Sequence, residues 1–557
     1  MAQAGTQEYK YFVKPSSETC YDYLLGCYGR ISADVGEYAA FQIFGCDTSM
    51  RDFVAEIEAL AAALYAKGFR EGDVLSVFLP TCAHSMVAFY ALSKLGVIAD
   101  FIHPLTPPEG LKKSLAGTKS KGLFLLDRAA AAYAGAVGDK TAIVCSFSDH
   151  VSGAAKSVVQ AQEAGLTLPA GENYVRYTDL IGTDAPAVPT TKKDSRETAV
   201  YMHGSGTTGV SKTVCLSAYA INSVAYSQYF IDRYHDYGKS YSICVLPFFH
   251  AFGLGASLHY CTCNAYTPIL VPKFDAHTVN DLIAKNNVQY ISGVPNMFYK
   301  MFEADNFDTP GLKSLTVLYS GGDIVSEGFI ERFTAVLKKN GSVATLFRGW
   351  GLTEMCAICS TNSHANHRAG SIGKIGKGLE VKVIDEDGKT LPPDAQGEIC
   401  LSGETMMNGY LPEEGVTETG IHYDENGKPW VHTGDMGYVD ADGYIFFTGR
   451  KKRIIIISGY NVYPYSIEQE ISRLPFVREA CAVQGYLNDK PCVKLCVVLA
   501  DETMRKETAE RDLLTYCEKH LDHFAVPRKI EFMSALPRTR MDKMDFLAMS
   551  DPLPENS

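Results

Sequence analysis

Short apolar runs alternate with amphipathic helical stretches along much of the chain, and this alternation restricts the fold more than any other feature. Residues 52–73 have the pattern of an amphipathic helix that ends at a glycine. The apolar run of residues 75–80 follows, and residues 84–96 have a second helical pattern. Helices that alternate with strands predict an α/β layer built on a mostly parallel sheet.

The same signal recurs further along the chain, where apolar runs end in glycine or polar turns. These runs are residues 141–147, 197–204, 240–248, 288–295 and 315–323. Ligands of open parallel sheets bind beyond the carboxyl ends of the strands. We therefore expect the functional site where these runs end.

The pattern changes near Gly397, where alternating residues indicate antiparallel strands at 397–403 and 443–449. A basic stretch from Arg450 to Arg453 follows, and about a hundred residues beyond it have their own helix and strand pattern. We predict domains at residues 1–450 and 451–557, with a hinge near Lys452. The expected fold class is α/β, with a large N-terminal domain of layered α/β subdomains and a β-rich part, and a small mobile α+β C-terminal domain.

Charge and hydropathy exclude several classes of protein. The formal net charge is −12 and the pI is near 5.7, so the chain lacks an overall electrostatic footprint for nucleic acid. The first residues lack the apolar core of a signal peptide, and Lys94 and Asp100 interrupt the most apolar stretch, residues 86–101. We expect no transmembrane segment and a cytoplasmic location.

The 16 cysteines are spread along the chain, which favours reduced thiols over disulfides. Cys356 and Cys359 form a C-x-x-C pair without a second pair at zinc-ligand spacing. This pair predicts two small buried side chains on a helix rather than a metal site.

A loop rich in glycine and hydroxyl groups follows the apolar run at 198–202. Glycines allow tight turns with inward N–H groups, hydroxyls add donors, and a lysine adds charge, which together suit a polyphosphate. The loop is not a Walker A sequence, because two residues separate its last glycine from the lysine. The alternative is a flexible surface loop. The candidate phosphate-binding residues are Ser205, Gly206, Thr207, Thr208, Gly209 and Lys212.

With this loop the sequence resembles the adenylate-forming (AMP-binding) superfamily of acyl- and aryl-CoA ligases, beetle luciferases and adenylation domains. The resemblance extends from about Tyr21 to Phe546. It implies that a carboxylic acid reacts with ATP and Mg²⁺ to give an acyl-adenylate and pyrophosphate. Transfer of the acyl group to coenzyme A would follow, with a fatty or aromatic acid as substrate.

His250 lies in the segment Phe-Phe-His-Ala-Phe-Gly that begins at residue 248. The matching histidine of the superfamily lines the carboxylate pocket and helps to gate the thiol tunnel, whereas by itself His250 would be a packed loop histidine. Between Leu246 and Gly255 there is no acidic residue of the kind that holds the ammonium group of amino-acid substrates.

Two further segments have counterparts in the superfamily. One lies along the adenine and acyl pocket and contains Gly321, Gly322 and Asp323; by itself it would be an ordinary turn. In the second, Trp350-Gly351-Leu352-Thr353-Glu354, the resemblance implies that the threonine contacts phosphate and that Glu354 holds Mg²⁺. Glu354 would otherwise be an acid at a helix N-terminus.

Asp435, in a Thr-Gly-Asp sequence, matches the aspartate that accepts hydrogen bonds from the ribose hydroxyls. Arg450 matches an arginine that contacts ribose or phosphate, and Lys452 lies at the position of the hinge. By itself the Thr-Gly-Asp sequence would be a common turn, and Arg450 and Lys452 would belong to a solvated basic patch.

Lys543 matches the terminal lysine of the superfamily, which would bridge the carboxylate and the α-phosphate. Met541 and Asp542 replace the usual Thr-Gly before it, Ile456 stands where some relatives have a lysine, and Ser466 replaces a usual glutamate. For the thioester step, the resemblance implies that the C-terminal domain rotates about the hinge, withdraws Lys543 and presents the Gly459 loop to the thiol tunnel.

Two other functions remain open from the sequence. One is an adenylating enzyme of another type, which would pass the acyl group to a carrier protein or oxidise it as luciferases do. The other is a nucleotide-binding pseudoenzyme, which would retain the nucleotide pocket but would have lost turnover because of Asp542.

Overall fold

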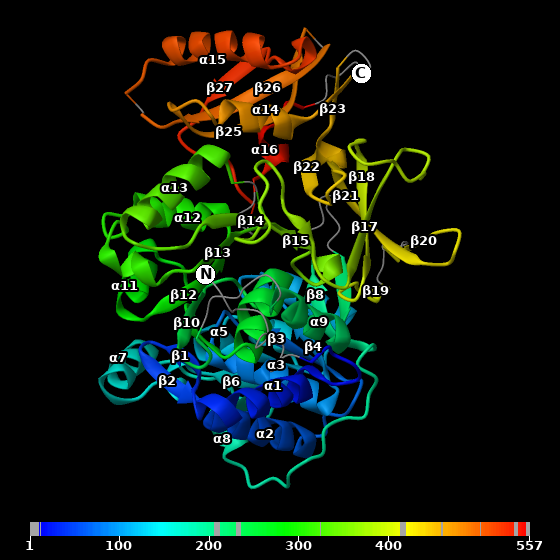
Figure 1. Ribbon diagram of the computed structural model, residues 1–557. Coiled ribbons are helices and arrows are strands. Elements are labelled where there is room, and N and C mark those ends of the chain that lie inside the picture. Colours follow the sequence, from blue (N-terminus) through cyan, green and yellow to red (C-terminus); the bar gives the residue numbers. More distant parts are fainter. Residues whose placement is uncertain are drawn as a thin grey trace.

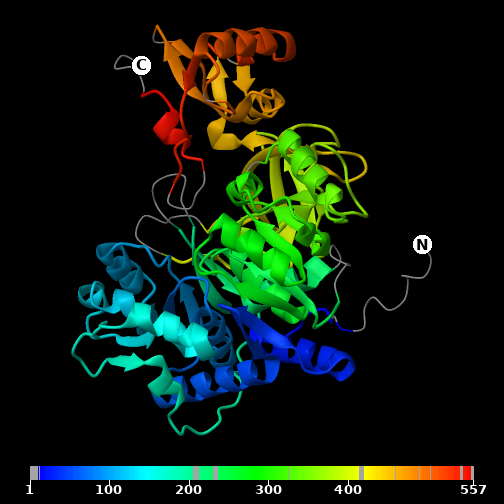
Figure 2. The ribbon, with the colours of Figure 1, turned by 90° about the vertical axis from the view of Figure 1, so that its left-hand side faces the viewer.

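The computed structural model describes residues 11, 13–204, 212–229, 236–323, 325–412, 419–457, 460–488, 490–501, 503–539 and 544–552. Two α/β layers and a β-rich part form the large N-terminal portion, and a smaller α+β portion lies at one end of it (Figure 1). The view turned by 90° shows the C-terminal portion at the same end of the molecule (Figure 2). The predicted fold class is confirmed.

The first α/β layer contains an eight-stranded sheet in the order β19-β9-β8-β4-β3-β5-β6-β7. Strands β3 to β8 pair in parallel, and β8–β9 and β9–β19 pair antiparallel. The strands are β3 (Val74–Phe78), β4 (Ile98–Phe101), β5 (Gly122–Leu126), β6 (Thr141–Cys145), β7 (Tyr174–Arg176), β8 (Thr198–His203), β9 (Thr213–Ser217) and β19 (Gly409–Tyr410).

Helices alternate with these strands in the chain, as the sequence predicts. They are α2 (Met50–Ala66), α3 (Ala83–Leu95), α4 (Pro108–Gly117), α5 (Asp127–Ala130), α6 (Ala134–Val137), α7 (Gly153–Glu163), α8 (Tyr177–Ile181) and α9 (Ala218–Tyr229). Helix α2 begins where the Ser49 hydroxyl accepts a hydrogen bond from the backbone N–H of Asp52, an N-cap that satisfies one free donor of the first turn.

The second layer contains a nine-stranded sheet in the order β16-β15-β14-β13-β12-β10-β11-β1-β2. Its central strands are parallel: β1 (Ala39–Ile43), β10 (Ser240–Cys244), β11 (Tyr266–Leu270), β12 (Val288–Gly293), β13 (Val317–Ser320) and β14 (Leu346–Trp350). The antiparallel edges are β2 (Cys46–Ser49), β15 (Ser360–Thr361) and β16 (Lys374–Ile375). Its helices are α1 (Cys20–Val35), α10 (Tyr260–Cys263), α11 (Ala276–Lys285), α12 (Pro295–Glu303) and α13 (Glu327–Lys339), with a π-helical segment at Gly253–His259.

The β-rich part is an antiparallel sheet, as the change of pattern near Gly397 predicts. Its strands are β17 (Leu379–Ile384), β18 (Gly397–Gly403), β20 (His422–Tyr423), β21 (Pro429–Val439) and β22 (Ile445–Arg450). One short helical turn, Lys451–Arg453, follows β22.

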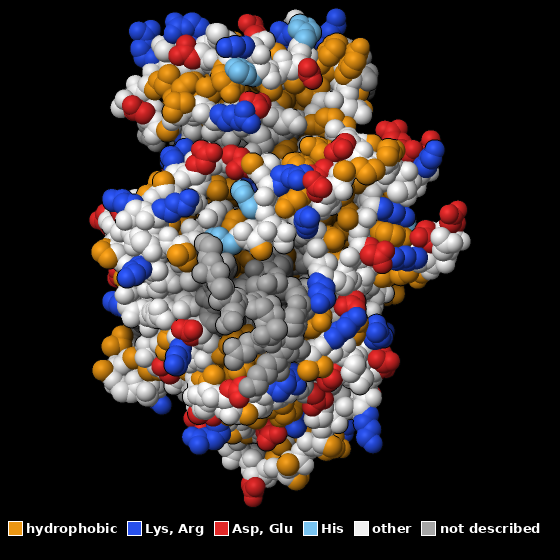
Figure 3. All heavy atoms as spheres, in the orientation of Figure 1, with side chains coloured by type: hydrophobic (Ala, Val, Ile, Leu, Met, Phe, Trp, Pro, Cys, Tyr) orange, Lys and Arg blue, Asp and Glu red, His pale blue; other side chains and the backbone are white. Residues whose placement is uncertain are grey.

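The C-terminal portion has its own hydrophobic core. Its elements are β23 (Ile455–Ile457), β24 (Tyr460–Val462), α14 (Pro464–Ile471), β25 (Val477–Leu487), β26 (Lys490–Leu499), α15 (Lys506–His520), β27 (Lys529–Phe532) and α16 (Phe546–Met549). A constriction separates this portion from the rest on the face shown in Figure 3, where cationic and anionic side chains are interspersed. None of the described helices combines the length and the hydropathy needed to cross a bilayer.

Candidate active site

The candidate site lies at one edge of the nine-stranded sheet. Because β10 to β14 are parallel neighbours, the segments that follow them emerge at the same edge. These segments are residues 245–250, 271–274, 294–297, 321–323 and 351–354. Three of the five runs that were predicted to end near a ligand, residues 240–248, 288–295 and 315–323, therefore meet at this edge, while the runs at 141–147 and 197–204 belong to the eight-stranded sheet.

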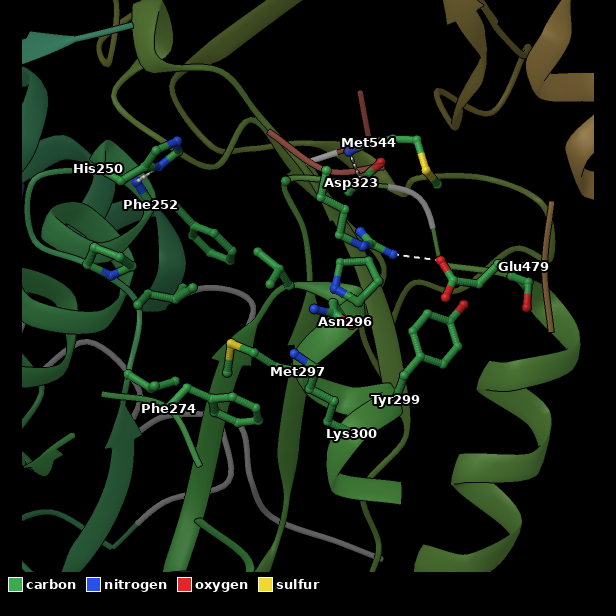
Figure 4. A pocket seen from close by; sticks show the side chains of 18 of the residues that line it. His250, Phe252, Phe274, Asn296, Met297, Tyr299, Lys300, Asp323, Glu479 and Met544 are labelled. Atoms are coloured by element: carbon green, nitrogen blue, oxygen red, sulfur yellow. Dashed lines mark hydrogen bonds and ion pairs between the residues drawn. The ribbon is translucent and has the colours of Figure 1, made fainter. Parts of the chain in front are cut away.

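A cavity of about 360 Å³ lies at this edge and is lined by residues of both portions. Phe252, Phe274 and Met297 reach into it from the N-terminal portion (Figure 4). Leu246 and Val294 add further apolar surface. Such a lining favours the hydrocarbon body of a ligand.

His250 lines the same cavity, as predicted from its position after the β10 run. Its backbone N–H donates to Pro247 O at 3.0 Å, and its Nδ1 accepts from the Phe252 N–H at 3.3 Å. The first contact holds the backbone of this turn, and the second orients the imidazole. The π-helical segment Gly253–His259 begins three residues later, a conformation that often occurs at functional sites.

The C-terminal portion forms the other wall of the cavity. Arg538 and Glu479 form an ion pair with an N–O distance of 2.6 Å, and both line the cavity. The backbone N–H of Met544 lies 3.4 Å from Asp323 Oδ2 in the N-terminal portion (Figure 4). Gly322 and Asp323 thus lie where the two portions meet. This wall could not be foreseen from the sequence.

Trp350, Asp435 and Arg450 form one cluster beside the sheet edge. The Trp350 indole N–H donates to Asp435 Oδ2 at 2.7 Å, and Arg450 Nε lies 2.8 Å from Asp435 Oδ1. Asp435 and Arg450 are register partners on β21 and β22, and the aspartate side chain is only 1% exposed. The structure brings together three residues that the sequence placed in separate motifs.

Glu354 and Lys212 both contact Tyr410, a residue that the sequence analysis missed. The Tyr410 hydroxyl donates to Glu354 Oε1 at 2.8 Å, and Lys212 Nζ lies 4.6 Å from the centre of the Tyr410 ring. No described lysine, arginine or histidine forms an ion pair with Glu354. A carboxylate ligand fits Mg²⁺, which prefers oxygen donors.

Strands β8 and β9 flank the predicted phosphate loop. Residues 205–211, which include Ser205, Gly206, Thr207, Thr208 and Gly209, lie outside the described residues. At the base of the loop, the Gly204 N–H donates to Lys212 O at 2.9 Å.

A second missed group stands beside this loop. His203 Nε2 lies 2.7 Å from Asp100 Oδ1, and its Nδ1 lies 3.1 Å from the Thr213 hydroxyl. The fully buried Asp100 also accepts hydrogen bonds from Ser76 and Thr118 at 2.6 and 2.9 Å. The group joins the two strands that precede and follow the loop.

The segment after β14 is compact. Thr353 lies in a single helical turn, and a Cβ on Gly351 would overlap the carbonyl of Ala357, so the close approach requires glycine. Cys356 and Cys359 are buried as predicted, but the predicted helix is wrong, because Cys356 has a φ of 55° and ends the turn. Burial raises the pKa of both thiols well above the usual range.

Three predictions concern the C-terminal portion. Lys452 lies in the turn between β22 and β23, which is where a hinge would act. Gly459 and Lys543 lie outside the described residues, as do Met541 and Asp542.

All 16 cysteines of the chain are free thiols, as the sequence predicts.

Comparison with known proteins identifies the family. The chain belongs to the AMP-binding enzyme family, which matches residues 32–411, and the AMP-binding enzyme C-terminal domain matches residues 466–543. The resemblance inferred from the sequence motifs is confirmed.

Curated relatives cover most of the chain. A protein named probable 4-coumarate--CoA ligase 3 of Dictyostelium discoideum is 30% identical over 88% of this chain and 88% of its own length. A long-chain-fatty-acid--CoA ligase of Escherichia coli is 27% identical over 94% of this chain and 93% of its own length.

Solved structures share the fold. An anthranilate CoA ligase in complex with anthranoyl-AMP is similar with a TM-score of 0.79 and 21% identity, covering 95% of this chain and 96% of its own. A benzoate CoA ligase of Burkholderia xenovorans has the same TM-score, 0.79, with 18% identity, and the match covers 96% of this chain and 100% of its own.

Proposed function

We propose that this chain is an ATP-dependent acid–CoA ligase that forms an acyl-adenylate, releases pyrophosphate and then forms the coenzyme A thioester. The observation that carries the proposal is the meeting, at one sheet edge, of an apolar cavity and two polar clusters, one around Asp435 and one around Glu354. Relatives named as CoA ligases along nearly the whole chain favour coenzyme A over a carrier protein.

The polar clusters suit the parts of ATP. Asp435 would accept hydrogen bonds from the ribose hydroxyls, because Trp350 and Arg450 already hold its carboxylate in place. Lys212, the loop residues before it and Thr353 would contact phosphate oxygens. Mg²⁺ at Glu354 would offset phosphate charge. Gly321 and Gly322 would let adenine and the acyl group approach the backbone.

The acid would occupy the apolar cavity with its carboxylate near His250. Attack on the α-phosphorus builds negative charge on phosphate oxygens, which Lys212 and Lys543 would stabilise by preorganised electrostatics. The apolar lining by Phe252, Phe274 and Met297 supports a fatty or aromatic acid as substrate.

For the thioester step, we propose that residues 451–557 rotate as a domain against residues 1–450 at Lys452. The rotation would withdraw Lys543 and bring the Gly459 loop towards the entering thiol. The single helical turn between β22 and β23 supports a hinge at this point. The free cysteines support the cytoplasmic location expected from the sequence.

The test is pyrophosphate release from ATP and Mg²⁺ over a panel of fatty, aromatic and amino acids, with and without coenzyme A, while mass spectrometry follows the thioester. We expect one fatty or aromatic class to give both products. Acid-dependent pyrophosphate without a thioester would reject coenzyme A as the acceptor, and silence across the panel would reject the ligase.

Two lysine variants sharpen this test. Lys543→Ala should lower acyl-adenylate formation by about 100-fold or more, as for loss of one preorganised donor. Thioester formation from supplied acyl-adenylate should persist. Lys519→Ala, on the exposed face of α15, is the matched control and should change neither step.

A further inference from the structure

We propose that Tyr410 is a positioning residue that holds the metal-binding carboxylate of Glu354 at a fixed distance from the phosphate-binding Lys212. This inference rests on the proposed function, which assigns these roles to the two charged residues. The same tyrosine contacts both, through its hydroxyl and through its ring.

The first step of the argument is the double contact with the Glu354 segment. The Tyr410 hydroxyl donates to Glu354 Oε1 at 2.8 Å, and the Met407 N–H donates to the Glu354 carbonyl oxygen at 2.9 Å. A segment only four residues long therefore holds both the backbone and the side chain of Glu354. The hydroxyl orients one carboxylate oxygen, Oε1, and none of the described residues donates a hydrogen bond to the other, Oε2.

The second step is the attachment of Tyr410 to the phosphate-binding strand. Tyr410 pairs with Val214 on β9, and the Leu411 N–H donates to Thr213 O at 2.8 Å. Lys212 immediately precedes this strand, and its ammonium lies 4.6 Å from the ring centre, within the range of a cation–π contact. The ring thus faces one charge while its hydroxyl holds the opposite charge.

The third step is the confinement of the ring. Gly420 has a φ of 73°, and a Cβ added there would overlap Tyr410 Cε2 and Met407 Cε. The backbone at Gly420 therefore packs against the ring, and only glycine permits this approach. Because Gly420 packs against the ring, the ring is held in place and its hydroxyl keeps the Glu354 carboxylate in one position. Groups that orient a metal ligand in this way are a usual part of a metal site.

The test separates the hydroxyl from the ring. In Tyr410→Phe the ring stays and the hydrogen bond to the carboxylate is lost, so metal binding should weaken about tenfold. The affinity for the nucleotide without metal should not change. In Tyr410→Leu both should weaken, because the cation–π contact is lost as well.

Metal binding is measured with Mn²⁺ by electron paramagnetic resonance, in the presence of the full chain and α,β-methylene-ATP. Nucleotide affinity is measured by calorimetry in EDTA. Neither measurement needs turnover, so the result is independent of whether the wild-type protein forms a thioester. The Mg²⁺ concentration that half-saturates pyrophosphate release gives a second readout and should rise in the same proportion.

The matched control is Tyr28→Phe. It removes a hydroxyl that donates to Glu37 at 2.6 Å, and both of these residues are far from Tyr410 in the sequence. It should leave Mn²⁺ binding unchanged. Gly420→Ala should displace the ring together with its hydroxyl and should therefore weaken both metal binding and nucleotide binding, as in Tyr410→Leu. Equal Mn²⁺ affinity in the wild type and in Tyr410→Phe would overturn the proposal, as would an equal loss in the Tyr28→Phe control.

Discussion

A fall in pH from 7 to 5 should destabilise the N-terminal portion through His259, which is fully buried at the end of the π-helical segment Gly253–His259. Its Nε2 lies 2.8 Å from Asn222 Oδ1, and its Nδ1 lies 3.1 Å from the Tyr90 hydroxyl. A neutral imidazole satisfies both contacts, donating to the amide oxygen and accepting from the hydroxyl. Burial lowers the pKa of His259 from 6.5 to about 3.

The sign follows from linkage. The unfolded chain binds a proton at His259 below pH 6.5, while the folded protein does not until far lower pH. The stability contributed by the neutral imidazole is therefore complete above the unfolded pKa and is lost as the pH falls below it. Over roughly 1.5 pH units, at about 1.4 kcal/mol per unit, the free energy of unfolding should fall by about 2 kcal/mol by pH 5.

The assay is urea unfolding at pH 7 and pH 5, followed by fluorescence of Trp350 and Trp430, the two tryptophans of the chain. His259→Gln retains polar atoms and does not titrate, so its stability should fall by about 2 kcal/mol less than that of the wild type. His277→Gln, at an exposed ion pair with Asp305, is the control. If wild type and His259→Gln lose equal stability in acid, the reasoning is refuted.

Three substitutions test the site itself. Asp435→Asn keeps an acceptor for Trp350 and removes the charge that pairs with Arg450, so the KM for ATP should rise about tenfold, and an unchanged KM would contradict the ribose role. Met297→Ala enlarges the cavity and should raise kcat/KM for bulkier acids about tenfold relative to the preferred acid; an unchanged ranking would show that the acid does not contact this side chain. Lys452→Pro fixes φ at the proposed hinge and should slow thioester formation more than adenylation in single-turnover assays, whereas equal loss of both would argue against a hinge there.

The sequence predicted elements whose pattern is local. Apolar periodicity placed α2, β3 and α3, and the change near Gly397 placed the antiparallel sheet. The start of α2 lies at Met50, because Ser49 caps the helix and the apolar periodicity by itself does not mark that turn.

The helix predicted for Cys356 and Cys359 failed for a backbone reason. Cys356 has a φ of 55° and Ala357 has a φ of 113°, so the chain turns back towards Gly351 after one helical turn. Two buried cysteines three residues apart fit a helix by spacing, but the left-handed backbone at these residues ends it.

The partners missed by the sequence analysis are distant along the chain. Tyr410 is 56 residues from Glu354, and His203 is 103 residues from Asp100. The second pair depends on β4 lying beside β8, and the first depends on the turn Thr353–Met355 lying beside the segment that leads into β19. Motifs identify groups that would touch a ligand, but residues that orient such groups carry no local pattern.

The position of His259 links the stability argument to the cavity. His250 precedes the π-helical segment and lines the cavity, while His259 ends the segment in the core beneath. Protonation of the buried imidazole would break its acceptor contact with Tyr90 and loosen the helix that follows His250. Low pH should therefore impair binding of the carboxylic acid substrate before it unfolds the C-terminal portion, whose separate core contains none of these residues. A His259→Gln variant that kept its KM for the carboxylic acid at pH 5, where the wild type lost it, would assign this sensitivity to the scaffold and not to His250.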